Sequence, residues 1–139
     1  MQNTKKCIFP GTFKIFHNGH INILKRAKSL FDTVYVVVAN NDTKQYIDIN
    51  TRFENVKKVV DELKLDNVIV AKWDAYLVEF AKQHSIYFIV RGIRDTTDFK
   101  YEKAIERIYK QQWNQIEVVY LFADKELEDL SATKILSKK

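Results

Sequence analysis

Short runs of β-branched and aromatic residues recur along the chain, and longer amphipathic stretches separate them. The clearest run, Val34 to Ala39, is a nearly unbroken series of valines, which is typical of a parallel strand buried on both faces. Four other runs have the length and composition of strands; they cover residues 6–9, 67–71, 86–90 and 116–122. The pattern therefore predicts five short strands.

The stretches between these runs carry apolar residues at helical spacing. They predict helices over residues 19–31, 50–63 and 97–112, a short helix after residue 74, and a final short helix from Ser131. Asn50 or Thr51 is expected to cap the second helix, because Thr51 and Glu54 have capping-box spacing. Asp74 is expected to cap the third, with Leu77, Phe80 and Ala81 facing inward.

Strands that alternate with helices predict an α/β fold. We expect a single Rossmann-like domain over residues 1–139, with a five-stranded parallel sheet and helices on both faces. In such sheets ligands bind beyond the carboxyl ends of the strands, where the strand order reverses. Residues that directly follow a strand are therefore the candidates for function.

Composition adds few constraints. Apolar residues make up 46% of the chain and charged residues 29%, as in an ordinary globular protein, and the net charge of +5 favours anionic partners. The lone Cys7 lies in a predicted strand and is expected to be a small core residue. No apolar run approaches the roughly 18 residues that span a bilayer, so we expect a cytoplasmic protein without a membrane partner.

The first candidate cluster, residues 10–20, joins the first strand to the first helix and reads Pro-Gly-Thr-Phe-Lys-Ile-Phe-His-Asn-Gly-His. Gly11 lets the backbone approach a phosphate, and His17 and His20 fall at a helix N-terminus, where free N–H groups attract anions. A plain turn with two solvated histidines is the alternative, but the His-x-Gly-His spacing after a strand favours phosphate binding. A zinc site at these histidines lacks further ligands, so no metal site in the protein is predicted.

Two further clusters follow strands. Arg91 and Arg94 come after the fourth strand and can bind phosphate oxygens, although exposed ion pairs are the alternative. Residues 129–134 place hydroxyl groups at the start of the last helix, where N-capping is the alternative. Together the clusters predict a phosphate-lined cleft suited to phosphoryl or nucleotidyl transfer. A P-loop and a Gly-x-Gly-x-x-Gly motif are both missing, which argues against an ordinary P-loop kinase and a dehydrogenase.

Residues from Ile8 to about Leu136 resemble the bacterial phosphopantetheine adenylyltransferase family, within the HxGH nucleotidyltransferase superfamily. The most specific segment is Arg91 to Glu102, which is similar to the family's Arg-Gly-hydrophobic-Arg followed by Asp-Phe-x-Tyr-Glu. The resemblance implies transfer of the adenylyl group of ATP to 4′-phosphopantetheine by in-line attack, giving dephospho-coenzyme A and pyrophosphate. It also implies Mg²⁺ as cofactor, no nucleic-acid partner, and a homo-oligomer, commonly a hexamer in the family.

The resemblance also assigns roles to individual positions. The catalytic positions would be Thr12, His20, Lys44 and Arg91, with His20 binding the ATP phosphates and stabilising the transition state. The ATP-binding positions would be Thr12, Phe13, His20, Gly92, Ile93, Arg94, Glu102, Leu127, Glu128, Asp129, Leu130, Ser131, Ala132 and Thr133. The acceptor-binding positions would be Thr12, Lys44, Leu77 and Arg91.

The chain departs from the family where Lys14 and Ile15 replace the usual Asp-Pro, and where His17 replaces a Ser or Thr, as in cytidylyltransferases. A cytidylyltransferase acting on a small phosphorylated alcohol is therefore a second interpretation. A third is a non-catalytic nucleotide- or RNA-binding module, indicated by the basic charge and by Tyr101, Tyr109 and Trp113. The spacing of these aromatic residues is more typical of a packing face.

Overall fold

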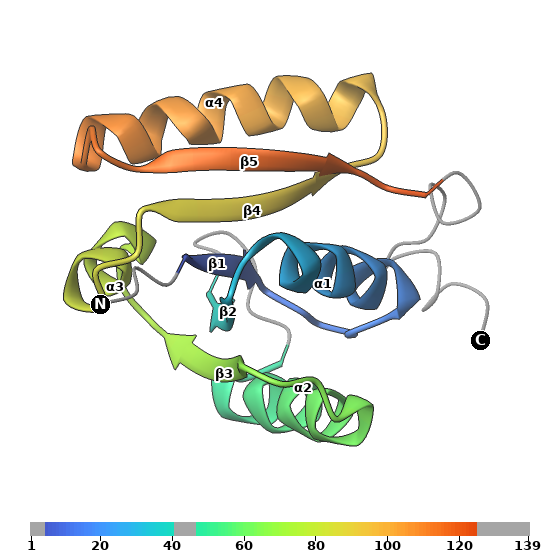
Figure 1. The fold of residues 1–139 in the computed structure, drawn as a ribbon. Coiled ribbons are helices and arrows are strands. Elements are labelled where there is room, and N and C mark those ends of the chain that lie inside the picture. The colour runs from blue at the N-terminus through green and yellow to red at the C-terminus, as the bar shows by residue number, and fades with distance from the viewer. Residues whose placement is uncertain (1–4, 41–46, 125–139) are drawn as a thin grey trace.

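The computed structural model describes residues 5–40 and 47–124. Strands and helices alternate along this part of the chain: β1 (Lys6–Gly11), α1 (Asn18–Leu30), β2 (Thr33–Ala39), α2 (Ile49–Leu63), β3 (Val68–Trp73), α3 (Leu77–Gln83), β4 (Phe88–Ile93), α4 (Thr96–Gln112) and β5 (Glu117–Phe122). All five strands are parallel and form one sheet in the order β3-β2-β1-β4-β5 (Figure 1). The predicted α/β fold is confirmed. The helix predicted from Ser131 lies outside the described residues.

Each face of the sheet packs against helices. On one face Cys7 and Phe9 of β1 join a core with α1 and α2, and on the other Ile8 joins a core with α3 and with Tyr109 of α4. The alternation along β1 follows from the period of two in a strand. Helices therefore cover both faces, as the alternating pattern predicts.

The two central strands are the most deeply buried part of the sheet. Four valines of β2, at positions 34, 36, 37 and 38, have no exposed surface, which confirms that this strand is buried on both faces. Cys7 of β1 is also fully buried, and this burial raises the pKa of its thiol to about 12. The thiol therefore stays protonated and belongs to the core, as predicted.

Two of the predicted helix caps are wrong. Asp48 caps α2, since its Oδ1 accepts the N–H of Asn50 at 2.8 Å, and Thr51 donates its hydroxyl to the same carboxylate at 2.7 Å. Asp74 does not cap α3, because its Oδ1 accepts a hydrogen bond from Asn40 Nδ2 at 2.6 Å. At α2 the earlier carboxylate of Asp48 takes the capping position that local spacing had assigned to Asn50 or Thr51. At α3 a side chain from elsewhere in the fold, Asn40, engages the carboxylate that had been assigned to the cap.

Three further expectations have mixed outcomes. Phe80 and Ala81 face the core as predicted, whereas Leu77 is only partly buried against it. The strand predicted from Ile86 begins at Phe88, because the N–H of the fully buried Ile86 bonds to Ala81 at the end of α3. Tyr109 and Trp113 pack on the same core, and Tyr101 is 59% exposed.

The strand order reverses between β1 and β4, which are neighbours in the sheet although α1, β2, α2, β3 and α3 separate them in the chain. Figure 1 shows β1 between β4 and β2, with α4 beside β5. The carboxyl ends of β1 and β4 are thus the expected ligand-binding edge. No helix within residues 5–40 and 47–124 is long and apolar enough to cross a membrane.

Candidate active site

A cavity of about 980 Å³ opens at the carboxyl ends of β1 and β4. Its walls come from the turn between β1 and α1, the end of β4, the inner side of α4 and the start of α3. Eight of the predicted site residues line it: Thr12, Phe13, His20, Leu77, Arg91, Gly92, Arg94 and Glu102. The two clusters that fall within the described residues therefore meet in one cavity, at the switch point of the sheet.

Phe13 anchors the turn after β1. Its ring lies edge-on to those of Phe9, Phe16 and His20, with centroids 5.5, 5.2 and 5.0 Å away, and only 4% of the residue is exposed. Its backbone is left-handed, with φ of 50°, which is uncommon outside glycine. Gly11 makes room for this ring, since a Cβ there would lie 2.7 Å from it. The glycine therefore permits the aromatic packing that supports His20.

His17 and His20 together form the N-terminal cap of α1. Nδ1 of His17 accepts the N–H of Gly19 at 3.0 Å, and Nδ1 of His20 accepts the N–H of His17 at 3.1 Å. This is a reciprocal capping box made by two histidines, whose rings stack with centroids 3.9 Å apart. The His-x-Gly-His spacing thus fixes the ring of His20 as well as bringing it to a helix N-terminus.

His20 is a neutral hydrogen-bond donor in the free site. Burial, and then the positive charges of His17 and Arg94, lower the pKa of His20 to about 3. Because Nδ1 accepts a backbone N–H, the proton of the neutral ring is on Nε2. His20 therefore offers an N–H group to an anion without a positive charge. The pKa of His17 is lowered for the same two reasons, burial and Arg94.

Arg91 is held in place before any ligand binds. Its Nε donates to the carboxylate of Glu102, and its Nη1 lies 3.5 Å from the hydroxyl of Tyr109. Burial acts most strongly and lowers the pKa of Arg91, but the hydrogen bond to Glu102 and the charges of Tyr109, Glu102 and Tyr101 together outweigh it, so the pKa is raised. Glu102 is itself 6% exposed, and its carbonyl accepts a hydrogen bond from Tyr120 at 3.2 Å. The guanidinium group is thus fixed and permanently charged in the cavity wall.

Arg94 is tied to the first turn of α4. Its backbone N–H and its Nε both donate to Oδ2 of Asp98 at 2.9 Å, and its Nη2 donates to Oδ1 at 3.2 Å. Its side chain is 40% exposed, and it also lines the cavity. The exposed ion pair that the sequence left as an alternative is therefore present, and it occurs at a residue of the cavity wall. Ile93, between the two arginines, is 4% exposed and belongs to the core; the structure does not bring it into the cavity wall.

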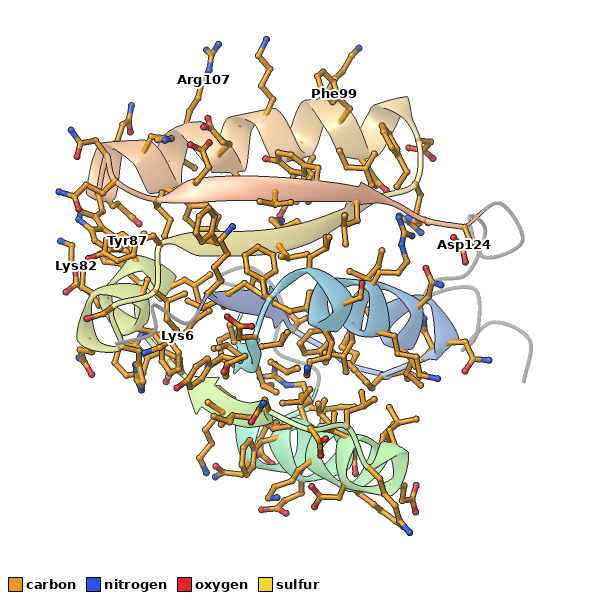
Figure 2. All side chains as sticks on the ribbon, viewed as in Figure 1. Lys6, Lys82, Tyr87, Phe99, Arg107 and Asp124 are labelled. Carbon is orange, nitrogen blue, oxygen red and sulfur yellow. The ribbon has the colours of Figure 1, made fainter. Side chains whose placement is uncertain are left out.

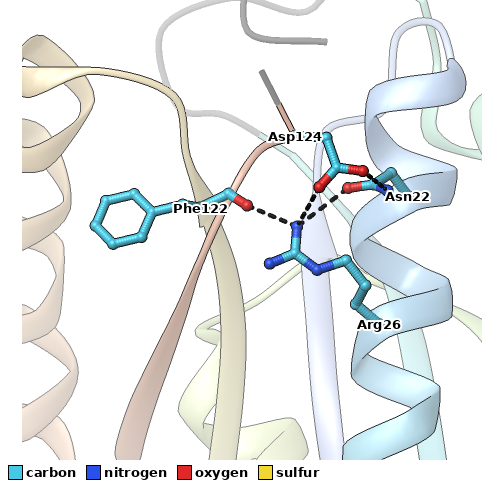
Figure 3. A network of polar contacts seen from close by, with 4 residues as sticks. All are labelled: Asn22, Arg26, Phe122 and Asp124. Carbon is cyan, nitrogen blue, oxygen red and sulfur yellow. Dashed lines mark hydrogen bonds and ion pairs between the residues drawn. The ribbon is translucent and has the colours of Figure 1, made fainter. Parts of the chain in front are cut away.

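A polar network joins α1 to the end of β5 (Figure 3). Nη1 of Arg26 donates to the carbonyl of Phe122 at 2.6 Å and lies 3.4 Å from Asp124. Asn22 donates to the other oxygen of Asp124 at 2.8 Å. Because Asn22 is two residues after His20, the network holds the end of β5 beside the helix that carries the histidine pair.

Sequence reasoning missed three polar residues at or behind the cavity. Asn40 and Asp74 line it, and Arg52 lies behind the wall with 3% of its surface exposed. The signal for Arg52 was available, since it shares one buried stripe of α2 with Val56 and Val60 at a spacing of four residues. A charged residue on an otherwise apolar stripe indicates a specific buried partner.

Some predicted site residues lie outside the described part of the chain. These are Lys44 and the segment Leu127, Glu128, Asp129, Leu130, Ser131, Ala132 and Thr133. Within residues 5–40 and 47–124, no three His, Cys, Asp or Glu side chains come together as a metal site. The zinc alternative at His17 and His20 also finds no support, because both Nδ1 atoms accept backbone N–H groups.

Comparisons with known proteins show the family of the chain. Residues 8–138 match the family described as cytidylyltransferase-like. The phosphopantetheine adenylyltransferase of Malacoplasma penetrans is 55% identical over 136 residues, which cover 98% of this chain and 91% of that protein. The enzyme of the same name from Mycoplasma mycoides subsp. mycoides is 39% identical, with 93% and 92% covered.

The fold also resembles that of a solved structure, the lipopolysaccharide core biosynthesis protein from Thermoplasma volcanium, with a TM-score of 0.59. The two chains are 23% identical, and the match covers 88% of this chain and 98% of the other. At this identity the likeness supports the fold alone.

Proposed function

The chain belongs to the phosphopantetheine adenylyltransferase family, and from that premise we propose that it transfers the adenylyl group of ATP to 4′-phosphopantetheine. The products are dephospho-coenzyme A and pyrophosphate. The observation that carries the proposal is that the β1–α1 turn with its histidine pair and the Arg91–Arg94 segment line a single cavity at the β1–β4 switch point.

The chemistry needs little from the protein beyond binding and charge stabilisation. The phosphate of phosphopantetheine has a second pKa near 6, so it is largely dianionic at neutral pH and needs no general base. One of its oxygens forms a bond to the α-phosphorus of ATP in line with the leaving group. The bond from that phosphorus to the bridging oxygen breaks, and pyrophosphate leaves without an enzyme-bound intermediate. The cost lies in bringing two polyanions together.

The described residues are suited to reduce that cost. Arg91 and Arg94 supply permanent positive charge to the cavity wall, and Arg91 is already fixed by Glu102. His20 donates its Nε2–H to a phosphate oxygen, and its neutral state lets it do so without changing protonation during the reaction. A donor fixed in advance does not have to reorient as charge develops during the reaction.

Mg²⁺ is proposed to enter with the nucleotide. Mg²⁺ binds mainly phosphate oxygens and water in nucleotide sites, with few protein ligands. Within residues 5–40 and 47–124 the carboxylates that line the cavity are Asp74 and Glu102, which are engaged with Asn40 and Arg91. This fits an ion carried by the triphosphate. When bound, the ion neutralises charge on the triphosphate.

We also propose that the protein is a cytoplasmic homo-oligomer. Support for self-association comes from Phe99 of α4, which is 55% exposed and does not line the cavity, whereas the exposed Tyr101 and Ile108 of the same helix do line it. Figure 2 shows Phe99 projecting from the side of α4 that faces away from the sheet. Sedimentation equilibrium tests this proposal: a monomer at micromolar concentration would contradict it.

The activity is tested with a panel of substrates. Purified protein is incubated with ATP or CTP, each alone, with phosphopantetheine, or with a set of small phosphorylated alcohols, and the nucleotidylated product and pyrophosphate are quantified. Equal amounts of both products, only with ATP and phosphopantetheine together, are expected. Use of CTP with another phosphorylated alcohol would instead identify a cytidylyltransferase. Nucleotide binding without turnover of any acceptor would identify a binding module.

A further inference from the structure

The mechanism above leaves Arg52, a buried charged residue of α2, without a role. Its guanidinium group donates to four acceptors that come from three places in the chain. Nη1 bonds to the carbonyls of Thr12 at 2.8 Å and Ala39 at 2.7 Å, Nε bonds to the carbonyl of Ile47 at 2.7 Å, and Nη2 bonds to the side-chain oxygen of Asn40. Arg52 therefore ties the connections after β1 and β2 to the start of α2.

The four acceptors are neutral, and burial lowers the pKa of Arg52, an effect that the carboxylates of Asp48 and Asp74 only partly offset. Within the described residues Arg52 forms no ion pair with a carboxylate, and burying a guanidinium group costs free energy unless its hydrogen bonds are well satisfied. An apolar residue would continue the stripe of Val56 and Val60 without that cost. The guanidinium group therefore contributes through its hydrogen bonds, because its several donors can join acceptors from different parts of the chain.

The contacts of Arg52 end in the cavity wall. Thr12, Ala39 and Asn40 line the cavity, whereas Arg52 itself does not. Asn40 extends the network to Asp74 through its Nδ2, at 2.6 Å. Asp74 is three residues before Leu77, the residue that the family resemblance assigns to the acceptor, and residues 74–77 all line the cavity. One guanidinium group thus fixes the nucleotide turn at Thr12 relative to the wall beyond β2 and β3.

We propose that Arg52 is a positioning residue for adenylyl transfer, which sets the place of Thr12 relative to the Asn40–Asp74 wall that receives the acceptor. The inference rests on the proposed function and deepens it. Thr12 is one predicted nucleotide position, but His20, Arg91 and Arg94 are held by His17, Glu102 and Asp98 and not by Arg52. Most of the predicted nucleotide contacts therefore stay in place when Thr12 shifts. Loss of the guanidinium group misplaces the acceptor, and a misplacement of about 1 Å can cost about 100-fold in rate.

The test compares Arg52→Lys with Val60→Ala. Arg52→Lys keeps the charge but cannot reach all four acceptors. Val60→Ala lies on the same buried stripe, weakens α2 through lost packing and touches none of these contacts, so it is the matched control for stability. Expected for Arg52→Lys is a 10- to 100-fold lower kcat/KM for phosphopantetheine, with the Kd of ATP by calorimetry changed by less than about 3-fold. Val60→Ala is expected to keep both constants within about 3-fold.

Asn40→Ala is the second variant, and it tests the same network if Arg52→Lys does not fold. It removes one acceptor of Arg52 and the link to Asp74 from a partly exposed position. It is expected to lower kcat/KM for phosphopantetheine at least about 5-fold while ATP affinity is kept. Folded variants that keep the wild-type kcat/KM, or that lose ATP affinity and turnover in equal measure, would overturn the positioning role alone. A wild-type protein that forms no dephospho-coenzyme A would overturn the proposed function and this role together.

Discussion

The neutral state of the partly buried His20 predicts a specific loss of stability in mild acid. The pKa of His20 is about 3 in the folded protein and 6.5 in the unfolded chain. Between these values the unfolded state binds a proton that the folded state does not, so the free energy of unfolding falls as the pH is lowered below 6.5. From pH 7.5 to 5.5 the expected loss from this one residue is about 1.4 kcal/mol, and it holds while the folded pKa stays well below 5.5.

Urea unfolding of the wild type and of His20→Gln at pH 7.5 and 5.5 measures this loss. Gln is the natural choice because a Gln at this position of a capping box can still accept the N-cap N–H. The wild type should lose about 1.4 kcal/mol more than the variant between the two pH values. Protein concentration is held constant, since an oligomer would otherwise shift the apparent stability.

Nitrogen-15 NMR of the imidazole rings gives an independent readout. At pH 7.5 the His20 ring should carry its proton on Nε2, with Nδ1 as the acceptor. A His20 signal that titrates near pH 6.5, or an equal pH dependence of stability in the wild type and His20→Gln, would refute the reasoning.

Three further substitutions test other parts of the site. His17→Ala removes the N-cap acceptor and should cost about 1 kcal/mol in urea unfolding, whereas His17→Thr, which restores an acceptor, should recover most of that loss. Gly11→Ala brings a Cβ within 2.7 Å of the Phe13 ring and should lower the free energy of unfolding by about 1–3 kcal/mol. Combining it with Phe13→Leu should recover part of this loss, and strictly additive effects of the two substitutions would contradict the contact. Glu102→Gln removes the carboxylate that holds Arg91 and should raise the KM of the substrates about tenfold, while an unchanged KM would show that Arg91 needs no such support.

Local pattern was sufficient for the sheet. The valine run of β2 and the alternation of strands and helices predict a parallel sheet covered on both faces. Both features depend on the spacing of apolar residues within short segments of the chain, which the sequence shows directly. The caps of α2 and α3 were predicted wrongly because several side chains compete for the same hydrogen bonds, and the spacing of residues does not show which of them forms the bond. Asp74, for example, bonds to Asn40, which is 34 residues away in the chain.

The candidate site was predicted in part for the same reason. The strand-end positions of His20, Arg91 and Arg94 follow from motif and topology, and the structure brings them to one cavity. The capping role of the two histidines and the neutral state of His20 depend on tertiary burial, which spacing alone does not show. The contacts of Arg52 join residues 13 and 40 positions away, so only its place on an apolar stripe indicated a buried partner.

The most direct test of the account follows the phosphorus atoms of ATP through a single turnover with phosphopantetheine. ATP labelled at the α-phosphate should give labelled dephospho-coenzyme A, and ATP labelled at the γ-phosphate should give labelled pyrophosphate, with no label on the protein at any time. Label from the γ-phosphate in the acceptor product, or an adenylylated protein, would contradict direct adenylyl transfer in the β1–β4 cavity.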